Sequence, residues 1–81
     1  MKITVKLFAT LREFLPEDAV NAAFGVDVEA RQTVRELLKR LKLPEDLPKI
    51  VLVNGQHTAG DTELREGDTV SIFPPLVGGE G

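Results

Sequence analysis

The stretch that decides the fold is TVRELLKRLKLP, Thr33 to Pro44, the clearest helical segment of the chain. Thr33 is a good N-cap, and Glu36 three residues later completes the T-x-x-E pattern of a capping box. Pro44 ends the pattern, because a proline disfavours helical geometry in the residue before it. The apolar residues fall on one face at helical spacing; they are Val34, Leu37, Leu38 and Leu41. One amphipathic helix is therefore predicted after Thr33.

The opposite face of this helix is basic, and two interpretations of it are open. Its cations are Arg35, Lys39, Arg40 and Lys42. They form either a patch for nucleic acid or an ordinary solvated helix face. The formal net charge of the whole chain is -3, whereas nucleic-acid binders usually carry a basic surface. The charge balance therefore favours the solvated face.

Two strand patterns precede the helix. Ile3, Val5 and Leu7 alternate with polar residues, which is the period of a half-buried strand. Residues 19–29 alternate again around Phe24 and Val26. Between them, residues 8–15 predict a short helical turn or loop. The two strands are expected to pair antiparallel across this long connection.

Two more strand patterns follow the helix. Ile50 to Val53 is a short apolar run that ends in Asn54-Gly55, the strongest two-residue turn signal, so the chain is expected to turn back there. Residues 66–68 predict another turn, and residues 69–73 alternate once more. Pro74 and Pro75 then end the last strand, because proline cannot donate to a sheet ladder.

This order of elements predicts an α+β domain in which one main helix packs across a mixed sheet. A single helix between hairpins suggests the ubiquitin-like β-grasp, with the first and last strands side by side and parallel. At 81 residues there is room for one core only. We expect the domain to span residues 1–75 and residues 76–81 to be a flexible C-terminal tail.

Composition excludes several classes of function. The chain has no cysteine, which excludes disulfides, thiolate metal sites and a cysteine nucleophile. The start alternates like a strand instead of resembling a signal peptide, and no apolar run approaches the roughly 20 residues of a membrane span. We therefore expect a cytoplasmic protein whose partners include neither membrane nor nucleic acid.

Catalytic patterns are also absent from the sequence. His57 is the only histidine, and beside Asn54-Gly55 it is expected to be a solvent-facing residue of a hairpin. The acidic residues show no spacing typical of a carboxylate pair, and the terminal glycines precede no helix that would hold a phosphate. We expect neither an enzyme nor a metal site.

The last nine residues, FPPLVGGEG, have a composition of their own. Pro74-Pro75 favours a stiff, extended start, and Leu76 and Val77 would be exposed apolar anchors. Gly78-Gly79 has no side chains and can therefore enter a channel as narrow as a backbone. The alternative is a frayed terminus, which is common in small domains. The combination of a stiff start, anchors and a slim tip favours a functional tail.

Strand parity adds a candidate docking surface. If Val70 and Ile72 face the helix, Phe73 faces the other way, and Phe8 at the end of the first strand would lie beside it. Either Val51 and Val53 or Ile50 and Leu52 would join them. Such an apolar patch beside a tail is typical of a partner-binding surface. The alternative is that Phe8 turns into the core.

Four stretches together resemble a known family. They are LFATLRE at 7–13, VNG at 53–55, L-x-x-G-D-x-V-x-I-F-P-P at 64–75 and the Gly78-Gly79 end. In this order they resemble the MoaD/ThiS sulfur carriers, which are ubiquitin-like β-grasp proteins. The ending combined with LFA-x-LRE is most similar to the small subunit of molybdopterin synthase.

The resemblance implies a carrier that has no cofactor of its own. An E1-like enzyme, using ATP and magnesium, would adenylate the C-terminal glycine, and sulfur would then replace the AMP to give a thiocarboxylate. A larger synthase subunit would consume that sulfur in molybdopterin synthesis. By the same resemblance Gly79 would be modified, and residues 73–77, which include Leu76 and Val77, would be gripped by partners.

The chain departs from the family pattern at its end, where Glu80-Gly81 follows the Gly-Gly pair. Two extended residues displace the carboxylate by roughly 7 Å, too far for attack on a phosphate at near contact. We expect a peptidase to remove Glu80-Gly81. Two alternatives are that Gly81 itself is activated or that the tail is never activated. Other functions also remain open: a ubiquitin-like modifier conjugated through Gly79, and a binding-only β-grasp module.

Overall fold

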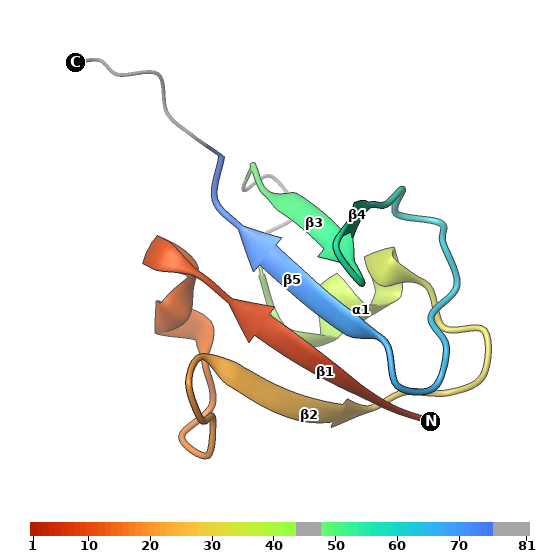
Figure 1. Ribbon diagram of the computed structural model, residues 1–81, viewed down its shortest axis with the longest axis horizontal. Helices are drawn as coiled ribbons and strands as arrows, with labels where there is room; N and C mark the ends of the chain where they lie inside the picture. Colours follow the sequence, from red (N-terminus) through yellow and green to blue (C-terminus); the bar gives the residue numbers. More distant parts are fainter. Residues whose placement is uncertain (44–47, 76–81) are drawn as a thin grey trace.

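The computed structural model describes residues 1–43 and 48–75, which form one sheet with one main helix (Figure 1). The elements are β1 (Lys2–Leu7), the 3-10 helix η1 (Ala9–Phe14), β2 (Ala23–Asp27), α1 (Val34–Arg40), β3 (Ile50–Val53), β4 (Gln56–His57) and β5 (Thr69–Phe73). The strand order is β2-β1-β5-β3-β4. β1 and β5 are parallel neighbours in the middle of the sheet, and the other pairs are antiparallel. The predicted ubiquitin-like β-grasp arrangement is confirmed.

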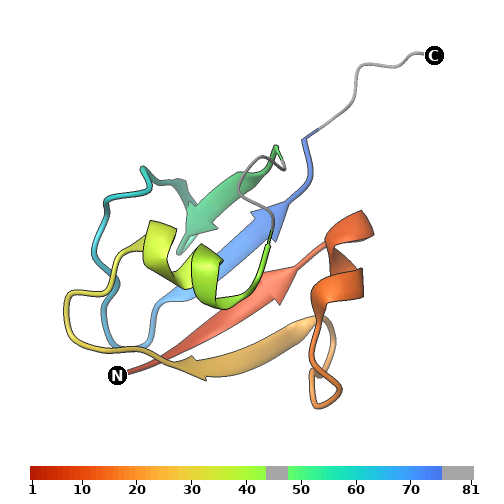
Figure 2. The ribbon, with the colours of Figure 1, turned by 180° about the vertical axis from the view of Figure 1, so that it is seen from behind.

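The core lies between α1 and one face of the sheet, as the view from behind shows (Figure 2). Every second side chain of the central strands points toward the helix and is buried. Leu11 of η1 and Leu64 of the loop before β5 are also buried in this core. The seven most deeply buried side chains are Ile3, Val5, Leu7, Val34, Leu37, Val70 and Ile72. The predicted inward faces of the helix and of the first and last strands are therefore confirmed.

The start of α1 satisfies its backbone donors completely. The Thr33 hydroxyl accepts from the Glu36 N–H, and the Glu36 carboxylate accepts from the Thr33 N–H, so the predicted capping box forms. The N–H groups of Val34 and Arg35 donate to the carbonyls of Thr62 and Gly60. The loop before β5 thus docks on the first turn of the helix. The helix ends at Arg40, earlier than the apolar pattern to Pro44 indicates, since Lys42 already has a φ of 63°.

The β3–β4 hairpin forms at Asn54-Gly55, as predicted. Both residues have positive φ, 53° and 84°, which is the geometry of a two-residue hairpin turn and the reason that Asn and Gly occupy it. The Asn54 side chain also accepts from the Thr69 N–H and donates to the Asp68 carboxylate. These bonds connect the hairpin to the beginning of β5.

The second strand is shorter than the alternation from residue 19 suggested. Asn21 and Ala22 both have positive φ, and Val20 and Ala23 exchange backbone hydrogen bonds across them. This tight turn contains neither glycine nor proline, and the prediction from alternation missed the one turn-forming residue in it, Asn21. β2 then pairs with β1 from Lys6↔Ala23 to Lys2↔Asp27, and confirms the expected antiparallel pair.

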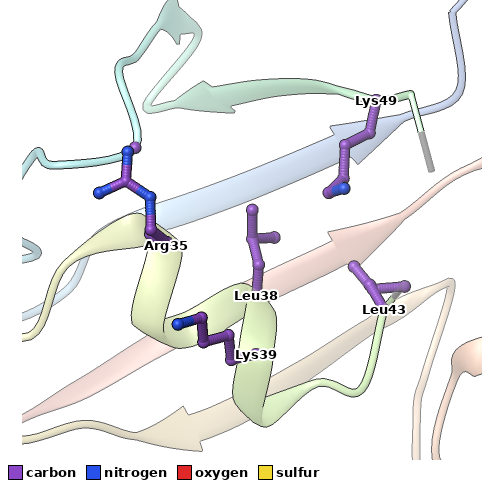
Figure 3. A pocket seen from close by; sticks show the side chains of 6 residues that line it. Arg35, Leu38, Lys39, Leu43 and Lys49 are labelled. Atoms are coloured by element: carbon purple, nitrogen blue, oxygen red, sulfur yellow. The ribbon is translucent and has the colours of Figure 1, made fainter. Parts of the chain in front are cut away.

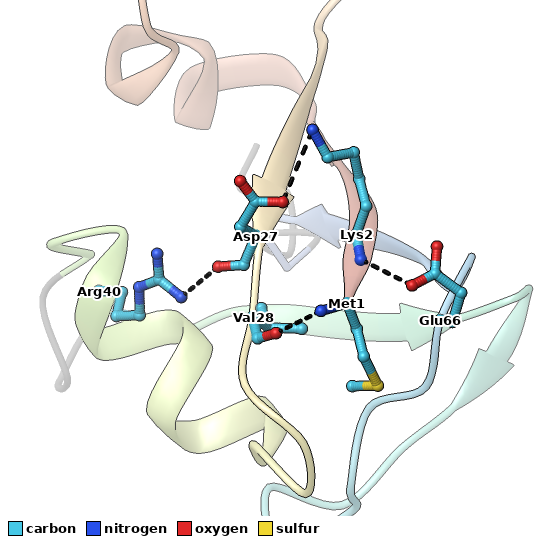
Figure 4. A network of polar contacts seen from close by, with 6 residues as sticks. All are labelled: Met1, Lys2, Asp27, Val28, Arg40 and Glu66. Carbon is cyan, nitrogen blue, oxygen red and sulfur yellow. Dashed lines mark hydrogen bonds and ion pairs between the residues drawn. The ribbon is translucent and has the colours of Figure 1, made fainter.

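Polar contacts attach the N-terminus to both neighbouring elements (Figure 4). The terminal ammonium donates to the Val28 carbonyl at 2.8 Å, and the Lys2 N–H donates to the Glu66 carboxylate at 3.0 Å. Arg40 reaches from the end of α1 to the Asp27 carbonyl at 2.7 Å. That carbonyl lies on the outer edge of β2, so Arg40 covers an acceptor that would otherwise be open to another strand.

None of the helices in residues 1–43 and 48–75 has the length and apolar character needed to cross a bilayer.

Candidate functional site

The candidate site begins at Phe8, the residue that follows β1. Its backbone stays extended, with φ -120° and ψ 156°, and its N–H donates to the Ile72 carbonyl at 3.1 Å. The parallel ladder and the alternation of side chains therefore continue for one residue beyond β1. The turn into η1 comes only at Ala9, whose φ is 53°. Phe8 consequently faces away from the core, and the alternative in which it turns inward is wrong.

Phe8 and Phe73 stack on each other on the open face of the sheet. Their ring centroids are 4.3 Å apart, and the ring planes differ by 5°. Both side chains remain half-buried. A stacked aromatic pair adds about 0.5–1.5 kcal/mol beyond the area that it buries. The stack therefore fixes the ends of the two central strands to each other at the point where the chain leaves the sheet.

The register of β3 decides which of its residues join the two rings. Ile50 lies opposite Phe73, and Leu52 lies opposite Ser71, so both are on the open face. Val51 and Val53 pack toward the core instead. Ile50 is 36% exposed, which is high for an isoleucine. We call Phe8, Ile50, Leu52 and Phe73 the open-face patch.

The open-face patch lies directly before the candidate tail. Pro74 and Pro75 are partly buried and carry the chain away from the end of β5 (Figure 1). Because β5 has a hydrogen-bonded strand on each side, the tail starts from the middle of the sheet. The remaining candidate residues, Leu76, Val77, Gly78, Gly79, Glu80 and Gly81, lie outside the described residues, as does the predicted flexible tail that they form.

The described residues offer little for acid–base or metal chemistry. His57 is exposed on β4, as predicted for a hairpin histidine. In residues 1–43 and 48–75 there is no group of three or more His, Cys, Asp or Glu side chains that could hold a metal ion. The arrangement is suited to docking a partner beside a chain end, and the open-face patch is its most distinctive surface.

The helix side of the molecule has a hollow that the sequence indicated only in part. Arg35 and Lys39 line a hollow together with residues from two distant segments, whereas Arg40 of the same basic face is bonded to β2. The helical spacing of Arg35, Leu38 and Lys39 was visible in the sequence. The contributions of Lys49 and Gly60 depend on tertiary structure.

Comparison with known proteins assigns the chain to a family. The family model described as "ThiS family" matches residues 5–79. The molybdopterin synthase sulfur carrier subunit of Escherichia coli is 38% identical over 80 residues, which cover 95% of this chain and 99% of that protein. Small archaeal modifier protein 3 of Haloferax volcanii is 35% identical over 96 residues, with 98% and 100% covered.

A solved structure agrees with this assignment. The putative molybdopterin converting factor, subunit 1, of Pyrococcus furiosus has a TM-score of 0.74 and 28% identity, and the match covers 93% of this chain and 98% of that one. Together these similarities confirm the predicted resemblance to MoaD/ThiS carriers and the prediction that the chain is not an enzyme. The chain belongs to the ThiS family.

Proposed function

We propose that this protein carries sulfur as a thiocarboxylate on Gly79 and donates it for molybdopterin synthesis. The observation that carries the proposal is the open-face patch at the origin of the tail, where Phe8 and Phe73 stack at 4.3 Å. The sulfur carrier subunit from Escherichia coli, 38% identical, supports the same function. Because that relative is a synthase subunit, we also propose that a larger synthase subunit binds this protein and receives its sulfur.

The proposed chemistry takes place at the main-chain terminus and needs no catalytic side chain of the carrier. An E1-like partner holds ATP and magnesium, and a terminal carboxylate oxygen attacks the α-phosphorus as pyrophosphate leaves. A sulfur donor then displaces AMP to give the thiocarboxylate. ATP-dependent activation of this kind is consistent with the expected cytoplasmic location. The open-face patch supports docking that aims the tail at the partner's nucleotide site.

The same proposal requires that Glu80-Gly81 be removed first. Two extended residues move the carboxylate by roughly 7 Å. Reacting atoms must approach to about 3–3.5 Å, and a misplacement of even 1 Å can lower a rate by about 100-fold. Glu80 would also bring a negative charge toward the phosphates of ATP. We therefore propose that a host peptidase exposes Gly79.

The test compares three chains with the activating enzyme of the same host. They are the full chain, a chain that ends at Gly79 and a chain that ends at Gly78, and the measurement is ATP–pyrophosphate exchange. We expect exchange with the chain ending at Gly79, at least about 100-fold slower exchange with the full chain, and none with the shortest chain. Equal rates for the first two chains would mean that Gly81 is the working end. Loss of exchange in all three would overturn the carrier function.

A second candidate function has support of its own. The 35% identical relative from Haloferax volcanii is named a modifier protein, so conjugation of Gly79 to lysines of other proteins is also proposed. The two functions share an activated terminus and differ in its acceptor. Isopeptide-linked C-terminal peptides on lysines of host proteins would support the modifier. Thiocarboxylate without such adducts would support the carrier alone.

A further inference from the structure

The helix side of the molecule has a hollow of about 200 Å³ that the proposed tail chemistry does not use (Figure 3). It lies between α1, the residue before β3 and the loop after β4. Its lining residues are Arg35, Leu38, Lys39, Leu43, Lys49 and Gly60. We call it the helix-side hollow. Its position across the sheet from the open-face patch makes it a separate surface.

The helix-side hollow combines an apolar floor with a cationic rim. Leu43 is buried and Leu38 is partly buried, so they form the inner wall. Arg35 and Lys39 are exposed and four residues apart on α1, which places them on the same side of the helix. Lys49 reaches in from the segment before β3 (Figure 3). An apolar centre inside a basic rim suits a ligand with an apolar body and flanking negative charge.

Gly60 positions one of these cations. Its carbonyl accepts from the Arg35 N–H at 2.8 Å. A Cβ at Gly60 would lie 2.9 Å from Nη2 and 3.2 Å from Cζ of Arg35. The guanidinium therefore packs directly against the glycine, and any side chain there would displace it. The missing Cβ is what allows the Arg35 guanidinium to lie this close to the loop at the rim.

The charges of Arg35 and Lys39 are available to a ligand. In the part of the chain that the structure describes, neither side chain has a hydrogen bond or an ion pair, whereas Arg40 of the same helix donates to the Asp27 carbonyl. Arg35 and Lys39 place two positive charges beside buried leucines, although the net charge of the chain is -3. The local charge is therefore opposite in sign to the charge of the whole molecule.

We propose that the helix-side hollow docks an acidic segment of a partner protein. One apolar side chain of that segment enters the hollow, and its neighbouring carboxylates pair with Arg35 and Lys39. The volume of about 200 Å³ is below the roughly 300–1,000 Å³ typical of small-molecule pockets, which favours a single side chain. Among the described residues, no aromatic side chain lines the hollow to stack a base, and a bare phosphate would leave the leucine floor unused.

This docking is independent of the sulfur chemistry. α1, which lines the helix-side hollow, covers one face of the sheet (Figure 2), and the open-face patch lies on the other face, so a partner bound at the helix leaves the open-face patch free for another protein. A carrier that moves between enzymes gains a second attachment point in this way. The inference goes beyond the proposed function and stands even if Gly79 is never activated.

The test is a titration of the full ¹⁵N-labelled chain with short synthetic peptides, followed by NMR. The probe is an acetylated, amidated Asp-Glu-Leu-Asp-Glu peptide. One matched control replaces its acids with Asn and Gln, and the other replaces Leu with Ala. We expect the acidic Leu peptide to shift the backbone amides of Arg35, Leu38, Lys39 and Gly60 in a saturable way. Raising the salt to about 0.3 M should weaken binding, because the rim pairs are exposed.

Variants of the rim make the test specific. Arg35→Gln together with Lys39→Gln should weaken binding by about tenfold, since each exposed ion pair accounts for up to about fivefold. Lys42→Gln, on the same segment but outside the hollow, should change it less than twofold. Gly60→Ala should weaken binding by about threefold through displacement of Arg35, with little change in thermal stability because only a flexible side chain must move.

Several results would overturn the proposal. They are equal binding of the acid-free peptide, shifts confined to the open-face patch, and full affinity in the doubly substituted variant. Equal shifts from inorganic phosphate and from the Ala peptide would identify a simple anion site instead. Glu45 and Asp46 lie between the lining residues Leu43 and Lys49 in the sequence, outside the described residues. Every titration therefore uses the full chain, so that these two acidic residues are present when the peptide binds.

Discussion

Phe73 connects the sheet to the tail, and its ring stacks on Phe8 at 4.3 Å. We expect Phe73→Ala to lower the kcat/KM of the activating enzyme by at least about tenfold, because truncating an aromatic anchor of an interface typically costs more than about 1 kcal/mol. Loss of the stack should lower the free energy of unfolding by about 1 kcal/mol. Activation kinetics and urea denaturation measure the two effects.

The matched control for this prediction is Val20→Ala. Val20 is 68% exposed and lies on the turn before β2, and it is not one of the residues of the open-face patch. The Val20→Ala substitution should leave the kcat/KM of the activating enzyme within twofold of its value with the unmodified chain. If both variants slow activation equally, or if Phe73→Ala has no effect, the open-face patch is not the docking surface.

Two glycines illustrate how backbone geometry decides the effect of one methyl group. Gly55 has a φ of 84°, a conformation that alanine adopts at a cost of about 1 kcal/mol, although no atom of the described residues lies within 4 Å of where its Cβ would be. Gly25 in β2 has no positive φ, and a Cβ there would meet only the Ile3 carbonyl at 3.9 Å. We expect Gly55→Ala to lower the free energy of unfolding by about 1 kcal/mol.

The control is Gly25→Ala, which should be neutral or stabilising by up to about 1 kcal/mol, because alanine loses less backbone entropy than glycine on folding. Urea unfolding of both variants gives the comparison. Equal destabilisation by the two substitutions would contradict the role given to the φ of Gly55.

At the scale of the element, α1 depends on its first turn. Thr33→Ala removes the hydroxyl that accepts from the Glu36 N–H, and the loss of such a cap lowers stability by about 0.5–2 kcal/mol. Glu36→Gln should have a smaller effect, since glutamine also completes a capping box. Thermal unfolding measures both, with the exposed Thr10→Ala as the matched control. A Thr33→Ala variant as stable as Thr10→Ala would contradict the role of the cap.

The elements with local chemical signals were predictable from the sequence. The capping box at Thr33 and Glu36 located the helix, and Asn54-Gly55 located the hairpin, because both signals act over two to four residues. The turn at Asn21-Ala22 was missed, because Asn21, which tolerates positive φ, is followed by Ala22 instead of a glycine, so the two-residue signal is weaker than at Asn54-Gly55. The early end of α1 was missed for a similar reason at Lys42.

The candidate site was predictable only in part, because it depends on long-range register. Alternation in residues 69–73 placed Phe73 on the open face, but whether Phe8 continued its strand was decided by the bond of its N–H to the Ile72 carbonyl. The choice of Ile50 and Leu52 over Val51 and Val53 depended on the pairing of β3 with β5. A single sequence carries no signal for such a register, nor for the packing of Arg35 on Gly60.

At the scale of the whole molecule, the sheet separates two surfaces with different chemistry. The open-face patch is apolar and adjoins the chain that leads to the tail, and the helix-side hollow is basic. The proposed function requires that an activating enzyme and a synthase subunit each recognise the protein and act on the same chain end. Two surfaces on opposite faces would allow one partner to hold the domain while another acts on Gly79.

The most direct test of the proposed function is the intact mass of the protein isolated from its own host. We predict a species that lacks Glu80 and Gly81 and carries sulfur in place of one oxygen at the terminus. The same exchange on the full-length chain would move the reactive end to Gly81. If only the unmodified full-length mass is found, with the activating enzyme and a sulfur source present, the sulfur-carrier function is contradicted.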